Sequence, residues 1–175
     1  MSRVTTALTL DNNMMITCRR AVSEDTSMFR RIRLQALKDS PEAFGSTYDS
    51  ARERDFDSWR EQLESTIAGS LRNTQFAFAD EECVGIAALY RLKGSGHGDI
   101  IMMWVSPESR GSDAASQLVS QLLSWAQNVG FNAVFLNVSD HNARAINFYK
   151  KMGFVETGEK IDVDLSRGLH GIRMK

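Results

Sequence analysis

The sequence predicts an α/β (α+β) fold in which helices flank a central mixed β-sheet. Short apolar runs alternate with amphipathic helical segments over most of the 175 residues. Two of these runs, at 100–105 and 132–138, enclose a helical segment, a unit expected to be parallel and right-handed. No repeat, low-complexity tract or proline- or glycine-rich linker divides the chain, so we expect one domain over residues 15–175.

The first half of the chain predicts two helices and three strands. Ser23 to Asp25 supply N-cap candidates for a helix to about Lys38, and Ser40-Pro41 should end it. Residues 40–50 form a loop rich in turn formers, and a second helix is expected over 55–67. The strands are expected at 16–21, 75–80 and 83–92, the last two joined as a hairpin. One face of each helix is apolar: Phe29, Ile32, Ala36 and Leu37 in the first, and Phe56, Trp59, Leu63 and Ile67 in the second.

The second half is a strand–helix–strand unit followed by a short helix and two strands. The run 100–105 is continuously apolar, as expected of a central strand buried on both faces. An amphipathic helix over 114–129 ends at Gly130, and another buried strand follows at 132–138. A helix over 143–152 precedes Gly153, and the last strands are expected at 155–164 and 169–174.

The composition is that of a globular protein without an obvious charged or apolar partner. Lys and Arg number 21 and Asp and Glu 22, which leaves a net charge of −1 and gives no support to nucleic-acid binding. No run approaches the ~18 apolar residues of a membrane span, so no membrane partner is expected. The three histidines are scattered, and we expect no metal site.

The cysteines and the N-terminal residues bear on location. Cys18 and Cys83 are far apart and form no CxxC motif, which favours two reduced thiols in a cytoplasmic protein. Residues 1–14 lack the basic start and apolar core of a signal peptide, and we expect a loose polar leader there. Met14 and Met15 are alternative start positions.

Two segments carry a family resemblance. Residues 102–126 read MMWVSPESRGSDAASQLVSQLLSWA, a strand with Val-x-Pro followed by a turn and a helix. Residues 135–154 read FLNVSDHNARAINFYKKMGF and contain N-x-x-A-x-x-F-Y-x-x-x-G-F. Together they resemble the acetyl-CoA-binding half of the GNAT superfamily of N-acetyltransferases, whose first pattern is V-x-P and then R/Q-x-x-G-x-G/A. SPEAFGSTYDS and HGDIIMMWV extend the resemblance to about residues 15–175.

The resemblance implies a GNAT-like acyl-CoA N-acyltransferase fold with acetyl-CoA as cosubstrate. Backbone amides at the start of the helix would hold the coenzyme A pyrophosphate, since a helix N-terminus favours anions. The strand edge would pair with the pantetheine arm, Asn142 would contact the coenzyme, and Tyr149 would lie near the thioester sulfur. The implied cofactor-binding residues are therefore Met103, Trp104, Val105, Arg110, Gly111, Ser112, Asp113, Ala114, Ala115, Asn142 and Tyr149.

Asp113 departs from the family pattern, which has glycine at its position. A carboxylate beside a pyrophosphate repels it, and its side chain can occupy the amides that a phosphate needs. Alternatively, Ser112 or Asp113 serves as an ordinary helix N-cap, a role worth ~1 kcal/mol. Two outcomes remain open. Either coenzyme A binds with Asp113 turned outward, or Asp113 seriously weakens the affinity for coenzyme A.

Two residues are the catalytic candidates, and the first loop supplies candidates for the acceptor site. Tyr149 would donate a hydrogen bond or proton to the leaving thiolate. Asp99 is the candidate general base, because it enters the central strand and resembles an acid in the GEI-type pattern of one family subgroup. Ile101 stands where many relatives have a glutamate on this strand, so no acid is present there. Asp99 could also be a turn residue, with a water chain or an amine of low pKa replacing the base. Phe44 and Tyr48, with Phe56 and Trp59, either wall the acceptor site or only pack in the core.

The expected activity is transfer of the acetyl group of acetyl-CoA to a primary amine by direct attack in a ternary complex. The acceptor would be a small molecule, an amino acid or a peptide or protein N-terminus. The alternatives are a catalytically degenerate module that binds acyl-CoA or a partner without turnover, and an interaction protein with no coenzyme. Many similar proteins are dimers, so a homodimer is kept as an open alternative.

Overall fold

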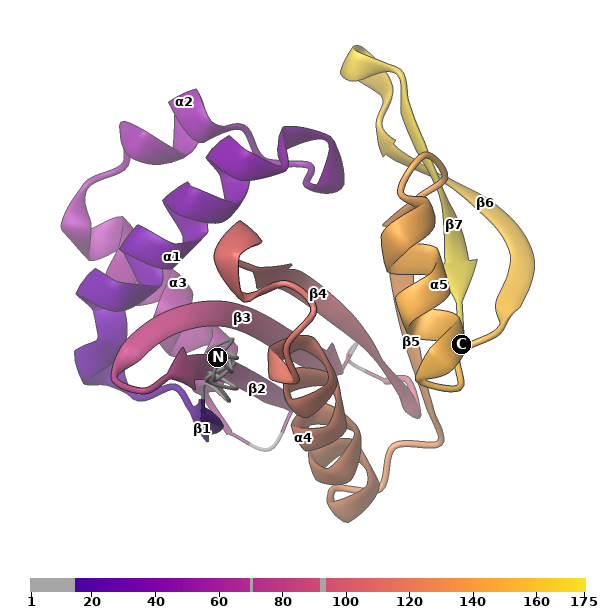
Figure 1. The fold of residues 1–175 in the computed structure, drawn as a ribbon, viewed down its shortest axis with the longest axis horizontal. Helices are drawn as coiled ribbons and strands as arrows, with labels where there is room; N and C mark the ends of the chain where they lie inside the picture. Colours follow the sequence, from indigo (N-terminus) through magenta and orange to yellow (C-terminus); the bar gives the residue numbers. More distant parts are fainter. Residues whose placement is uncertain (1–14, 70, 92–93) are drawn as a thin grey trace, which may run out of the picture.

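A seven-stranded mixed sheet organises the chain (Figure 1). The computed structural model describes residues 15–69, 71–91 and 94–175, so the leader expected at 1–14 lies outside the described residues. The strands follow the spatial order β1-β2-β3-β4-β5-β7-β6. Their bounds are β1 Ile16–Arg20, β2 Arg72–Ala79, β3 Glu82–Arg91, β4 His97–Val105, β5 Ala133–Ser139, β6 Glu156–Asp164 and β7 Leu169–Met174. Only the β4–β5 pair is parallel, as expected for the strand–helix–strand unit.

Helices cover both faces of the sheet. On one face lie α1 (Thr26–Asp39), α2 (Tyr48–Arg52) and α3 (Phe56–Ile67), and on the other lie α4 (Ala114–Asn128) and α5 (Ala143–Lys151). Alternate residues of β2 and β3 point to opposite sides: Phe76 and Ile86 pack under α1 and α3, whereas Ala77 and Ala87 pack under α4. The apolar faces predicted for α1 and α4 supply much of the two cores.

The strands β4 and β5 pair over only four residues and then separate. Their register runs from His97 opposite Ala133 to Ile100 opposite Leu136 and ends there. At this point β4 carries a bulge, with Met102 at φ 57°, and the register with β3 shifts between Ile86 and Ala88. Figure 1 shows the two strands diverging from the end where they pair. The second half of β4 therefore has β3 on one side and no strand on the other.

This separation corrects the prediction of two fully buried central strands. Ile101 is 38% exposed and Met103 is half-buried, because β5 no longer covers that side of β4. In β5, Asn137 is exposed. Part of the apolar run 100–105 therefore lines the gap between β4 and β5 and does not belong to the core.

Other differences lie in the first half of the chain. The loop expected at 40–50 contains the start of α2, whose N-cap Thr47 accepts a hydrogen bond from the Ser50 amide at 3.3 Å. Phe56 is 51% exposed at the first residue of α3, although its face was expected to be buried. β2 starts at Arg72, three residues before its predicted start, because Arg72 and Asn73 pair with β3.

Among the described residues, no helix is both long enough and apolar enough to cross a membrane. Cys18 is half-buried and Cys83 is buried, and both are free thiols. Burial raises the pKa of each thiol to about 11, so both remain protonated near neutral pH.

Candidate active site

A cavity of about 570 Å³ lies where β4 leaves β5. Its walls come from the second half of β4, the turn before α4, the first turn of α4, one face of α5 and the loop after α1. Of the residues with implied cofactor roles, these line it: Met103, Trp104, Val105, Arg110, Gly111, Ser112, Asp113, Ala115, Asn142 and Tyr149. The remaining one, Ala114, is fully buried beneath the turn. Ten residues chosen from the sequence thus meet around one space.

The turn before α4 leaves backbone amides free. Gly111 has φ 87°, a left-handed conformation that a side chain would strain. Ser112 Oγ accepts from the Ala114 amide at 3.3 Å and donates to the Ser109 carbonyl at 2.6 Å. Within the described residues, the amides of Ala115 and Ser116 find no acceptor. Free amides at a helix N-terminus make a site that favours anions such as phosphate.

Asp113 stands at the N-cap of α4, but its side chain makes no capping hydrogen bond. Its φ of −76° is ordinary for any L residue, so the backbone there does not require glycine. Asp113 is among the residues that line the cavity, and its carboxyl group does not occupy the helix amides. Of the two predicted N-cap side chains, Ser112 is the one that bonds to the first turn.

Asp39, at the end of α1, holds this turn in place. Its carboxylate accepts a 2.9 Å hydrogen bond from Trp104 Nε1 and forms an ion pair with Arg110. Arg110 Nε also donates to the Val105 carbonyl at 3.1 Å. Burial raises the pKa of Asp39, but hydrogen bonds from Trp104, Ser40 and Arg110 outweigh it and hold that pKa below its ordinary value. Arg110 therefore braces the turn with its side chain.

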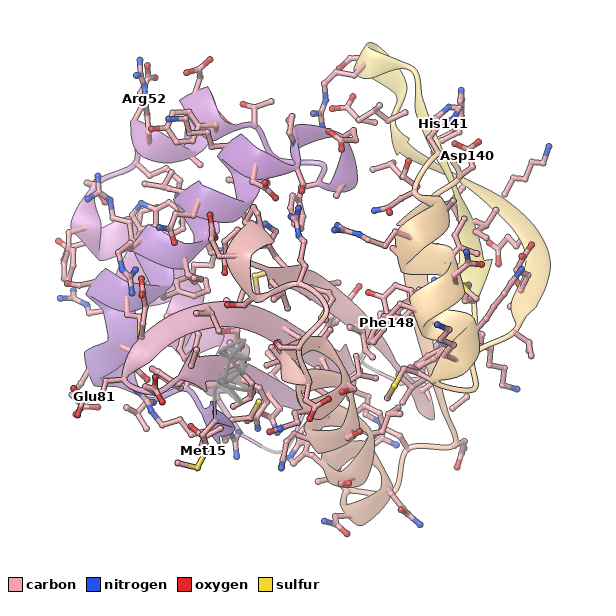
Figure 2. The ribbon with its side chains drawn as sticks, viewed as in Figure 1. Met15, Arg52, Glu81, Asp140, His141 and Phe148 are labelled. Carbon is pink, nitrogen blue, oxygen red and sulfur yellow. The ribbon has the colours of Figure 1, made fainter. Side chains whose placement is uncertain are left out.

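Helix α5 brings Tyr149 to the cavity. The ring is 6% exposed and lies edge-on to Phe154, with centroids 5.8 Å apart. Burial raises the pKa of the Tyr149 phenol, so the hydroxyl keeps its proton at neutral pH. Asn142 is the N-cap of α5 and accepts from the Ala145 amide at 3.0 Å. Phe148 lies on the flank of α5 that is turned towards α4 (Figure 2).

A second cavity, of about 360 Å³, adjoins the first. Phe44, Met103, Asn142 and Tyr149 are among the residues that line both. Its other walls come from α1, the loop after it, the middle of β4, the end of β5 and β6. The charged residues that line it are Arg33, Asp99 and Asp162. Phe44 thus lines both cavities, whereas Tyr48 packs beside the core of α1 and α3 and lines neither. The acceptor-site roles of both residues stay predictions.

Asp99 is 5% exposed and makes an ion pair with Arg173 of β7. Its Oδ1 lies 2.8 Å from Arg173 Nη2, and its Oδ2 has no hydrogen-bond partner among the described residues. The contact with Arg173 thus occupies one of the two carboxylate oxygens. The general-base role of Asp99 stays a prediction.

Two residues near the cavities, Arg33 and Asp39, were not predicted from the sequence. Arg33 falls four residues after Phe29 and four before Leu37, so a charged side chain on the apolar face of α1 was a readable signal. Asp39 had no such signal, because its partners Trp104 and Arg110 are more than sixty residues away.

Comparisons with known proteins agree with this geometry. The model of the acetyltransferase (GNAT) family matches residues 33–154. The uncharacterized N-acetyltransferase YobR of Bacillus subtilis is 36% identical over 64 residues, which are 37% of this chain and 26% of YobR. The matches to curated relatives span between 26% and 49% of those proteins.

Solved structures share the fold. An acetyltransferase of the GNAT family from Streptococcus pneumoniae superposes with a TM-score of 0.75 at 18% identity, covering 91% of this chain and 97% of that chain. The protein yncA of Salmonella typhimurium, solved with its cofactor acetyl-CoA, superposes with a TM-score of 0.74 at 18% identity, covering 91% of this chain and 92% of that chain.

Proposed function

The chain belongs to the GNAT family of acetyltransferases, and from that premise we propose that it transfers the acetyl group of acetyl-CoA to a primary amine. The observation that carries the proposal is the meeting of three features around the 570 Å³ cavity: free amides at the start of α4, the uncovered edge of β4, and Tyr149. Each suits a different part of the same cosubstrate.

The residues present fit coenzyme A in charge and in backbone geometry. The amides of Ala115 and Ser116 bind the pyrophosphate, and Gly111 lets the backbone approach it. Arg144 and Lys151 add positive charge to the same cavity. The edge of β4 beyond Ile100 holds the pantetheine arm as a further strand would be held.

When bound, acetyl-CoA supplies an activated acyl group in the form of a thioester. Tyr149 keeps a proton at its phenol oxygen and donates it to the sulfur as the carbon–sulfur bond breaks. The amine must lose a proton as the carbon–nitrogen bond forms. For a lysine-like amine of pKa ~10.4 that loss costs about 4.6 kcal/mol at pH 7. Asp99, through its free Oδ2, or a water molecule receives this proton.

The test is a thermal-shift measurement with acetyl-CoA followed by a panel of amines read by release of free thiol. A ligand at 100 times its Kd adds about 2.7 kcal/mol to the stability of the folded state. We expect acetyl-CoA to raise the melting temperature and at least one amine to release thiol. Absence of both results would refute the proposal.

One alternative has observations in its favour: a module that binds acyl-CoA without turnover. Asp113 is an acidic residue that lines the cofactor cavity, and Arg173 occupies one carboxylate oxygen of Asp99. A thermal shift with acetyl-CoA, combined with no thiol release from any amine in the panel, would favour this alternative.

A further inference from the structure

Arg33 is a buried cation without a counterion. The residue is 6% exposed, and its guanidinium makes no hydrogen bond or ion pair with any described residue. The Phe44 ring lies against the guanidinium, with its centroid 4.9 Å from Cζ. Arginine is almost never this buried unless it is paired, because an uncompensated buried charge is costly.

Of the charged residues that line the second cavity, Arg33 is the one cation, and no described carboxylate forms an ion pair with it. Asp99 pairs with Arg173 at 2.8 Å, and Asp162 Oδ1 lies 2.9 Å from His170 Nδ1. Burial and the charge of Arg54 lower the pKa of Arg33 to about 10, which still leaves it protonated at neutral pH. The cavity that adjoins Tyr149 is therefore lined by an unpaired arginine, together with Asp99 and Asp162, whose carboxylates contact Arg173 and His170.

Two spaces touch Arg33, and their sizes differ. The smaller, about 60 Å³, lies between α1, α2 and α3 and has room for one or two water molecules. The larger, about 360 Å³, has room for an organic acid and shares Phe44 and Tyr149 with the cofactor cavity. Only the larger space brings an anion held by Arg33 close to the place of acetyl transfer.

We propose that Arg33 binds a carboxylate of the acceptor, and that the acceptor is a small molecule that carries both an amine and a free carboxylate, as an amino acid does. This inference rests on the proposed acetyltransferase function and narrows its substrate. It disfavours polyamines, which have no anionic group, and peptide N-termini, whose adjacent carboxyl group is locked in an amide bond. Guanidinium and carboxylate form charge-assisted, often bidentate hydrogen bonds.

The substrate test compares each protein amino acid except cysteine and proline with its primary amide in the thiol-release assay, because cysteine has a thiol of its own and proline has no primary amine. The two members of a pair differ in the carboxylate alone, and the amide has the less basic amine, which favours the amide. Hydrogen bonds to charged groups contribute about 1.5–3 kcal/mol. For the preferred side chain we therefore expect kcat/KM for the acid to exceed that for the amide by at least about tenfold.

The protein test uses Arg33→Met, which keeps an unbranched apolar stem and removes the charge. We expect the acid-to-amide ratio of kcat/KM to fall towards one, and Arg33→Lys to keep part of the preference. Arg30→Met is the matched control, because Arg30 is exposed on the same helix. Thermal melts with and without acetyl-CoA check that each variant folds and binds the cofactor.

The possible outcomes distinguish failure of the Arg33 inference from failure of the proposed acetyltransferase function. Thiol release that is as fast with amides as with acids in the wild-type protein would overturn the inference and leave the acetyltransferase intact, with water as the partner of Arg33. A preference that survives in Arg33→Met would overturn it too. If no amine releases thiol, the same pairs are compared by calorimetry on the protein saturated with coenzyme A. Tighter binding of acids that Arg33→Met abolishes would support the carboxylate site, and equal binding would end it.

Discussion

Trp104 and Asp39 are joined by a hydrogen bond of 2.9 Å from the indole Nε1 to the carboxylate, across 65 residues of sequence. Because Arg110 also pairs with Asp39, one carboxylate ties the end of α1 to the end of β4 and to the turn before α4. That turn carries the free amides of the cofactor cavity. The first helix therefore helps to shape a site built from the second half of the chain.

Asp39→Asn should loosen this connection. The amide can still accept from Trp104, but it loses the charge that holds Arg110. We expect the free energy of unfolding to fall by about 1–2 kcal/mol in urea titrations. Calorimetry should show acetyl-CoA binding weakened several-fold. Asp57→Asn is the control, because Asp57 forms an exposed pair with Arg60 within α3 and should change stability by less than about 0.5 kcal/mol. Equal losses in the two variants would contradict the prediction.

The contribution of Asp39 should depend on pH in a defined direction. Its pKa in the folded protein lies below the ordinary value near 4, because hydrogen bonds outweigh the effect of burial. The stabilisation is thus complete above the unfolded pKa and is lost as the pH falls through the folded one. The stability difference between wild type and Asp39→Asn should stay constant from about pH 7 to 5 and shrink below about pH 4. A difference that widens on acidification would refute this assignment.

Asp113→Gly should strengthen acetyl-CoA binding. Asp113 lines the cavity at the start of α4 and its side chain caps nothing, so the substitution removes a negative charge near the free amides without removing a capping hydrogen bond. Charge effects at a helix N-terminus are worth about 0.3–1 kcal/mol, which corresponds to an affinity gain of roughly two- to fivefold in calorimetry. Asp113→Asn keeps the shape and should show most of the gain. Equal or weaker binding in both variants would remove Asp113 as an obstacle.

Local sequence patterns predicted most of the elements, and the family resemblance named ten of the residues that line the 570 Å³ cavity. The bounds expected for the last strand, 169–174, match β7, and the helix expected from Ala114 begins there. Both follow from signals within one segment, namely apolar periodicity and terminating glycines. The motif residues from 103 to 149 came together because the turn and α5 each carry their pattern in a short stretch.

What the sequence did not predict depends on contacts between distant segments. Ile101 is exposed because β5 turns away from β4 after Leu136, and an apolar run gives no sign of where its neighbour departs. The partners of Asp39 are known only once the sheet is assembled. Arg33 is the exception, since its place on the apolar face of α1 was visible in the spacing.

Tyr149→Phe is the variant that tests the chemistry. The substitution removes one hydroxyl and keeps the ring that packs against Phe148 and Phe154, so folding and acetyl-CoA binding should persist in thermal-shift measurements. Because burial keeps the phenol protonated, Tyr149 can donate a proton to the departing sulfur. We expect turnover to fall by about 10²-fold or more, the usual contribution of a general acid. Phe148→Leu is the control, since it trims the neighbouring ring and leaves the phenol in place. If Tyr149→Phe turns over a responsive amine at the wild-type rate, the leaving thiolate takes its proton from another source.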